Sequence, residues 1–141
     1  MTRHALAQSL ELTPESIFLL TPRQFEELVA DLLSSQGWNV ELTPPTRDGG
    51  VDIRASLTTG VSSVLCLVQV KKYRKDRAVG INSVRELYGV MEDHNASQAM
   101  IVTTSSFSRE ARAFAQRHQH QIFLHAYDAL AKWIQLRCRR R

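Results

Sequence analysis

The clearest helical pattern in the chain begins after Thr21. Apolar residues then recur at intervals of three and four positions, as in an amphipathic helix with one buried stripe. The stripe consists of Phe25, Leu28, Val29, Leu32 and Leu33. We expect Thr21 to be the N-cap, Pro22 the first helical residue and Gln24 the partner that completes a capping box. Gly37 is the expected C-cap, because glycine readily adopts the left-handed backbone that ends a helix.

Two glutamates follow each other on this helix, and only one of them can face a sheet packed against it. At about 100° per residue, Glu26 lies at the edge of the apolar stripe, whereas Glu27 points to the opposite side. A carboxylate at such a boundary fits either a salt bridge or a functional role. The pattern leaves both interpretations of Glu26 open.

A β-hairpin is predicted by two apolar segments joined by a short link around Gly60. The second segment, residues 64–71, is apolar on both faces until its end, as expected of a central strand covered on both sides. Side chains alternate along a strand, so Gln69 and Lys71 emerge on the same side. The turn would fold Asp52 back beside them. A carboxylate and an ammonium are costly beside a core unless they pair or bind something, so these residues are candidates for a site.

The remaining pattern predicts a mixed sheet between helices. A first strand at 38–43 ends at two prolines, which cannot serve a central ladder. After the hairpin we expect a helix at 81–91, a strand at 99–103, a helix after Ser108, a strand at 121–124 and a last helix capped by Asp128. An antiparallel opening followed by such crossovers implies a mixed sheet with helices on its faces.

Composition places the chain among ordinary globular proteins. Its 141 residues fit one domain, with 43% hydrophobic and 23% charged residues. Cys66 and Cys138 form no CxxC motif, which fits a reducing compartment. The apolar run at residues 17–20 is far too short to span a bilayer. We therefore expect a cytoplasmic protein with no membrane partner.

The formal net charge of +4 suits a polyanionic partner. Four basic residues follow the candidate site directly: Lys72, Arg74, Lys75 and Arg77. A solvated surface is the ordinary interpretation of a charge run, but its place beside the site favours contact with phosphates. Four arginines also crowd residues 137–141, where the two interpretations are balanced.

Several motifs resemble one known family. Asp48-Gly49-Gly50-Val51-Asp52, followed on the next strand by Gln69-x-Lys71, resembles the Mrr-like branch of the restriction-endonuclease (PD-(D/E)xK) superfamily. In that branch glutamine replaces the second acidic residue. Further matches occur in the family's order: Thr21-Pro22-x-x-Phe25-Glu26, Val84-Arg85-Glu86-Leu87-Tyr88-Gly89, and Val102-Thr103-Thr104 with Phe107 and Ala111. The resemblance covers residues 21–134 and implies a restriction-endonuclease-like three-layer α/β/α sandwich with a mixed central sheet.

The resemblance also implies a site. Asp52, Glu26, the Gln69 amide oxygen and the Val70 backbone carbonyl would hold Mg²⁺, for which Mn²⁺ can substitute, and Lys71 would orient or help deprotonate the attacking water. Because Gln69 carries no charge, we expect looser metal binding than a pair of strand carboxylates would give. Asp48 is ambiguous between a turn residue and a ligand, with the turn favoured. The competing structural interpretation is a buried Asp52–Lys71 ion pair with Gln69 filling hydrogen bonds.

The expected function is a metal-dependent DNA endonuclease of the Mrr-like restriction or defence type. The alternatives are a junction-resolving or repair nuclease and a DNA-binding module that does not cleave. The sequence does not decide between DNA and RNA as the substrate. Residues 1–20 would form an arm or a short helix from Thr13, residues 21–136 the nuclease domain, and 137–141 a basic tail. The first twenty residues cannot form a winged helix, so target choice would come from the domain itself, a homodimer or a separate recognition subunit.

Overall fold

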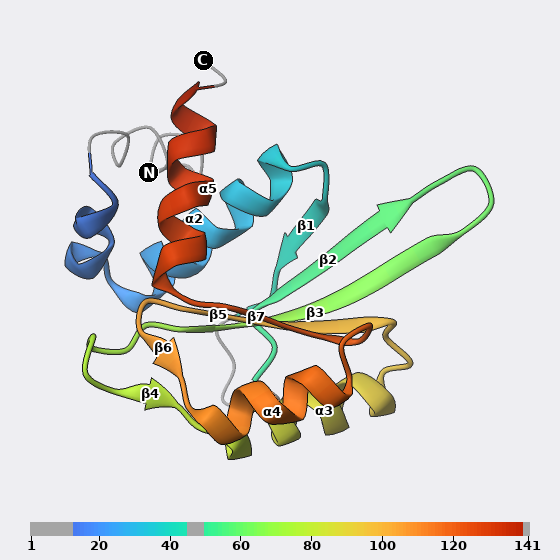
Figure 1. Cartoon of the computed structure of the whole chain (residues 1–141). Coiled ribbons are helices and arrows are strands. Elements are labelled where there is room, and N and C mark those ends of the chain that lie inside the picture. Colours follow the sequence, from blue (N-terminus) through green and yellow to red (C-terminus); the bar gives the residue numbers. More distant parts are fainter. Residues whose placement is uncertain (1–12, 45–49, 140–141) are drawn as a thin grey trace.

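A five-stranded sheet forms the centre of the molecule (Figure 1). The computed structural model describes residues 13–44 and 50–139, apart from the side chain of Cys138. In spatial order the sheet contains β1 (Asn39–Leu42), β2 (Ile53–Thr58), β3 (Ser63–Lys71), β5 (Gln98–Thr103) and β7 (Ile122–His125). β1, β2 and β3 are antiparallel, whereas β5 and β7 run parallel to β3. The mixed sheet expected from the sequence is confirmed, with β3 at its centre.

Helices cover both faces of this sheet, which confirms the three-layer arrangement (Figure 1). One layer holds α2 (Pro22–Ser35) and α5 (Tyr127–Arg139), with the short 3₁₀ helix η1 (Pro14–Leu19) beside α5. The opposite layer holds α3 (Ile81–Asp93) and α4 (Arg109–Arg117). No helix in residues 13–44 and 50–139 is long and apolar enough to cross a membrane.

Helix α2 begins as its sequence predicts, and its C-cap lies one residue before the expected Gly37. The Thr21 side chain accepts a hydrogen bond from the Gln24 backbone, and the Gln24 side chain accepts one from the Thr21 backbone, so the capping box is complete. Gln36 is the C-cap, and Gly37 directly after it has a φ of +102°. The expected buried stripe is confirmed, since all five of its residues are at most 1% exposed.

The β2–β3 hairpin contributes to two hydrophobic clusters, one on each face of the sheet. Ile53 pairs with Val68, and the turn closes with a 2.8 Å hydrogen bond from Thr59 to Ser62, around Gly60 as expected. Val68 belongs to the cluster under α2 and α5, whereas its neighbour Leu67 belongs to the cluster under α3 and α4. Alternation along β3 therefore supplies apolar side chains to both faces, which is why the strand is hydrophobic throughout.

Three details differ from the sequence expectation. A small parallel pair, β4 (Ala78–Val79) and β6 (Ser106–Phe107), joins two segments expected to be loops. Asp128 lies inside the first turn of α5, because the chain enters this helix at Ala126, whose carbonyl accepts from the amides of Ala129 and Leu130. The Asp128 cap is therefore wrong. Thr13 is the N-cap residue of η1, as expected, but its side chain makes no cap hydrogen bond.

The expected basic tail begins within a helix, because α5 continues to Arg139. Arg137 lies 3.3 Å from Asp31 of α2 in an ion pair with little exposure. This arginine therefore joins the two helices of one layer. The Asp48-Gly49 turn, the arm at residues 1–10 and the arginines at 140 and 141 lie outside the described residues.

Candidate active site

Asp52 lies directly before β2, where the antiparallel ladder to β3 ends. Its backbone amide donates to the Val68 carbonyl at 2.8 Å, and its carboxylate Oδ2 accepts from the Val70 amide at 2.7 Å. Asp52 therefore bonds to both chain neighbours of Gln69. Burial raises the pKa of Asp52, while the Val70 hydrogen bond and the charges of Lys71 and Arg23 oppose that rise.

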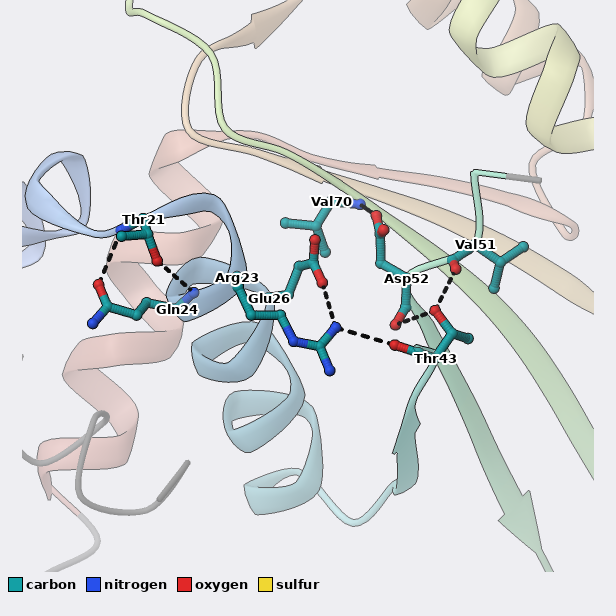
Figure 2. A network of polar contacts seen from close by, with 8 residues as sticks. All are labelled: Thr21, Arg23, Gln24, Glu26, Thr43, Val51, Asp52 and Val70. Carbon is teal, nitrogen blue, oxygen red and sulfur yellow. Dashed lines mark hydrogen bonds and ion pairs between the residues drawn. The ribbon is translucent and has the colours of Figure 1, made fainter. Parts of the chain in front are cut away.

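Glu26 extends from α2 towards Asp52 and Val70 (Figure 2). Burial is the largest cause that raises the pKa of Glu26, and the nearby charge of Asp52 adds to it. The expectation that Glu26 faces the sheet is confirmed, because its carboxylate and that of Asp52 are close enough to repel each other. This arrangement favours a cation between α2 and the start of β2.

Arg23 provides part of that positive charge. Its Nη1 donates to Glu26 Oε1 at 2.9 Å and to the Thr43 carbonyl at 3.1 Å (Figure 2). The salt-bridge interpretation of Glu26 is therefore confirmed, since its carboxylate pairs with Arg23 three residues earlier on the helix. The arginine and its carboxylate are 39% and 20% exposed, so solvent reaches the pair.

Thr43 fixes the backbone on the other side of Asp52. Its Oγ1 donates to the Val51 carbonyl at 2.7 Å and lies 3.2 Å from the Asp52 carbonyl (Figure 2). The Thr43 amide donates to the same Asp52 carbonyl at 3.0 Å. Thr43 directly follows β1, so this edge strand anchors the segment that enters β2. Asp52 is thus bonded to β3 on one side and to the end of β1 on the other.

Gln69 lines a cavity of about 630 Å³ on the face of the sheet covered by α3. The other residues that line it are Gly50, Glu86, Leu87, Gly89, Val90 and Asp93. The Gln69 Oε1 atom is buried and accepts no hydrogen bond from any described residue. A buried carbonyl oxygen without a donor is costly, so this atom is suited to a ligand that the protein itself does not supply.

Lys71 ends β3, where two threonines hold its backbone. The Lys71 carbonyl accepts from Thr103 Oγ1 at 2.8 Å and from the Thr104 amide at 3.3 Å. Thr104 Oγ1 also bonds to the amide and the carbonyl of Tyr73. Both threonines are fully buried. They therefore fix the direction in which the chain leaves the site.

The four basic residues after Lys71 differ in their surroundings. Arg74 is exposed, with a 3.5 Å ion pair to Asp76. The Arg77 guanidinium lies 4.1 Å from the centre of the Tyr73 ring. The Lys75 ammonium lies 5.3 Å and 5.8 Å from the rings of Phe18 in η1 and Tyr127 in α5, respectively. Lys72 is partly buried.

The charge of Asp52 acts on Glu26, and the charge of Lys71 acts on Asp52. Gln69 lies between the two β3 residues that bond to Asp52, but its side chain lines the cavity on the α3 face of the sheet, whereas Glu26 extends from α2 in the opposite layer. Within the described ranges, no three His, Cys, Asp or Glu side chains gather as a metal-binding group. A divalent cation here would rely on two carboxylates together with amide and backbone oxygens. Hard cations such as Mg²⁺ accept this mixture of oxygen ligands. The residues present here are therefore chemically suited to a divalent cation.

Three supporting residues were not identified from the sequence. Arg23 had a detectable signal, because it stands three residues before Glu26 on the same helix. Thr104 stands in the Val102-Thr103-Thr104 motif that resembles the family, but no role was predicted for it. Thr43 had no signal beyond its position at a strand end. The hydroxyls of Thr43 and Thr104 act on backbone groups that are 8 and 31 residues away, respectively, and only the folded sheet brings these groups together.

Sequence comparison places most of the chain in one family. A family model described as a restriction endonuclease, the Mrr catalytic domain, matches residues 19–134. The type IV methyl-directed restriction enzyme EcoKMrr of Escherichia coli (strain K12) is 32% identical over 108 residues, which cover 72% of this chain and 34% of that protein. The uncharacterised protein y4cE of Sinorhizobium fredii is 26% identical over 106 residues, which cover 75% of this chain and 27% of that protein.

Solved structures share the fold. The DNA modification-dependent restriction endonuclease AspBHI matches with a TM-score of 0.73 and 24% identity, over 94% of this chain and 36% of that one. MspJI restriction endonuclease, solved in complex with a 27-mer oligonucleotide, matches with a TM-score of 0.58 and 23% identity, over 94% of this chain and 30% of that one. The chain spans about a third or less of the curated relatives it matches. Because the family model covers more than half of the chain, the protein belongs to the Mrr-like restriction endonuclease family.

Proposed function

We propose that this domain is a metal-dependent endonuclease that hydrolyses phosphodiester bonds in DNA, and that it works in the cytoplasm. The observation that carries the proposal is that Glu26 extends from α2 towards Asp52 (Figure 2), whose charge raises the pKa of Glu26. A fold that only binds DNA gains nothing from two adjacent carboxylates near a phosphate, because both repel it. A divalent cation removes that conflict.

Asp52 and Glu26 are the proposed anionic ligands, and the Gln69 Oε1 and the Val70 backbone carbonyl the neutral ones. The absence of a described hydrogen-bond donor to Gln69 Oε1 supports its assignment. Mg²⁺, or Mn²⁺ in its place, would supply charge neutralisation at the phosphate and a more acidic water. With one neutral amide in the set, we expect weaker metal binding than three carboxylates would give.

Lys71 is the proposed cation beside the scissile phosphate. Its charge acts on Asp52, and its Nζ lies 5.7 Å from the centre of the Tyr73 ring. From there the ammonium would orient the attacking water and stabilise the negative charge that develops on the phosphate oxygens. The bonds from Thr103 and Thr104 to its backbone hold it in place for this role.

Arg74 and Arg77 are the proposed contacts to the DNA backbone near the site, with Lys72 beside them. Arg77 is supported by the Tyr73 ring, so its guanidinium is ordered before it meets a phosphate. Double-stranded DNA is the proposed substrate. The choice of sequence, modification or structure would rest with a dimer or a recognition module, since related restriction enzymes are much longer than this chain.

Plasmid cleavage tests the proposal. Purified protein is incubated with supercoiled plasmid and Mg²⁺ or Mn²⁺, beside Asp52→Asn, Glu26→Gln and Lys71→Ala. Asp128→Asn and Lys132→Ala serve as matched controls, because both residues are exposed on α5. We expect metal-dependent nicking or linearisation that is lost in the site variants and kept in the controls. Salt-dependent DNA binding without cleavage under either metal would instead support a binding module.

A further inference from the structure

Gly50 stands where no other residue fits without moving Gln69. A Cβ built at Gly50 would lie 2.5 Å from Gln69 Nε2 and 3.5 Å from Gln69 Cδ. The first distance is far below a van der Waals contact, so one of the two groups would have to shift. The backbone of Gly50 also has a φ of +60°, a conformation that glycine adopts without steric cost.

The collision concerns the functional end of the Gln69 side chain. With Nε2 facing Gly50, the other carboxamide atom, Oε1, is the one that remains buried and accepts no hydrogen bond from the described residues. The backbone of Gln69 is already fixed, because Asp52 bonds to the residues on both sides of it. The side-chain torsions of Gln69 are therefore the part of this residue that can respond to a larger residue at position 50.

We infer that Gly50 is a positioning residue, whose missing side chain sets the orientation of the Gln69 carboxamide and thereby the metal affinity of the site. This inference rests on the proposed function for its metal-binding consequence. Gly50 itself touches neither substrate nor metal in this scheme. It acts through Gln69.

The chain offers a matched control for backbone strain. Gly37 also has a positive φ, of +102°, but a Cβ there would meet nothing within 4 Å. Gly37→Ala therefore introduces the strain of a left-handed alanine without a collision. Gly50→Asn introduces the collision with less backbone strain, because asparagine tolerates this backbone region better than alanine and still carries a Cβ. Comparing both with Gly50→Ala separates strain from displacement of Gln69.

The experiment combines two readouts on the full chain. In metal-free protein, NMR follows the side-chain amide resonances of Gln69, assigned by their absence in Gln69→Ala. Mn²⁺ titration, followed by electron paramagnetic resonance, gives the metal affinity. We expect Gly50→Ala and Gly50→Asn to move the Gln69 resonances and to weaken Mn²⁺ binding about tenfold, as loss of a supporting group commonly does. Gly37→Ala should lower the melting temperature and leave both readouts unchanged.

A double-mutant cycle tests whether Gly50 acts through Gln69. Once Gln69 is alanine, the further change Gly50→Ala should leave Mn²⁺ affinity unaltered, because no carboxamide remains to be displaced. If the losses of Mn²⁺ affinity in Gly50→Ala and Gln69→Ala multiply in the double variant, the inference is overturned. It is also overturned if the Gln69 resonances do not move in either Gly50 variant. A wild type that binds no Mn²⁺ would refute the proposed function, while the resonances would still decide whether Gly50 positions Gln69.

Discussion

Asp52 accepts a 2.7 Å hydrogen bond from the backbone amide of Val70, the residue between Gln69 and Lys71. This bond joins the start of one strand to the end of the next. It orients a carboxylate next to two other candidate site residues through backbone geometry alone. Asp52 consequently has a structural role that is separable from its proposed chemical one.

Substitution of Asp52 should separate these roles. Asp52→Asn keeps an oxygen that can accept from the Val70 amide, whereas Asp52→Ala removes the acceptor and leaves a partly buried amide without its partner. We expect Asp52→Ala to be less stable than Asp52→Asn by about 1–3 kcal/mol, and both to lose cleavage. Urea unfolding measures the stability difference. Equal stability of the two variants would show that the bond contributes nothing to the fold.

The stability of metal-free protein should depend on pH through Asp52. Its pKa is raised above the ordinary value of 3.8, so in the folded state it holds its proton to higher pH than in the unfolded state. The stabilisation is therefore complete below pH 3.8 and is lost as pH rises through the folded pKa. We expect Asp52→Asn to gain stability relative to wild type between pH 4 and pH 7 in EDTA. Denaturation at several pH values checks this, and a constant difference would contradict it.

Arg23 should control the ionisation of both carboxylates. It bonds to Glu26 and lowers the pKa of Glu26 and of Asp52. In Arg23→Ala we expect both pKa values to rise, measured by carboxyl ¹³C NMR titration, with a stability cost below about 1 kcal/mol because the pair is partly exposed. Arg112→Ala, an exposed arginine on α4, is the control. Unchanged pKa values in Arg23→Ala would remove its electrostatic role.

DNA affinity should distinguish the arginines from Lys75. We expect Arg74→Ala and Arg77→Ala each to weaken DNA binding several-fold and to reduce the slope of log affinity against log salt by about 1. Lys75→Ala should act mainly on stability, because its ammonium lies over two rings. Fluorescence anisotropy at several salt concentrations provides the measurement, with Lys132→Ala as control. A larger loss of affinity in Lys75→Ala than in the arginine variants would reverse this assignment.

His125 should give a second pH dependence, away from the site. Burial lowers its pKa below 6.5, and its ring lies 4.8 Å from that of Trp133. The folded state therefore resists protonation, so the stabilisation is present above pH 6.5 and is lost as pH falls through the folded pKa. We expect His125→Phe to be less affected than wild type when pH is lowered from 7 to 5. Parallel stability curves for the two proteins would contradict this.

Local pattern and covalent chemistry determined most of the elements. The α2 stripe with its capping box and the two-sided hydrophobicity of β3 depend on neighbours within a few residues, so the sequence alone predicted them. The same holds for Glu26, whose angle from the apolar stripe predicts that it faces the sheet. The ordered motifs also indicated the family before any fold was known.

Tertiary structure decided how the site is held. The bond from Asp52 to Val70, the contact between Gly50 and Gln69, and the threonine hydroxyls on the Lys71 and Tyr73 backbones all depend on strand register. Register follows from the packing of the whole sheet, and a shift of one residue would turn every side chain to the other face. The sequence alone indicated which chemical groups the candidate site contains. Only the folded sheet decided which of them meet, because contacts between distant residues depend on how all the strands and helices pack together.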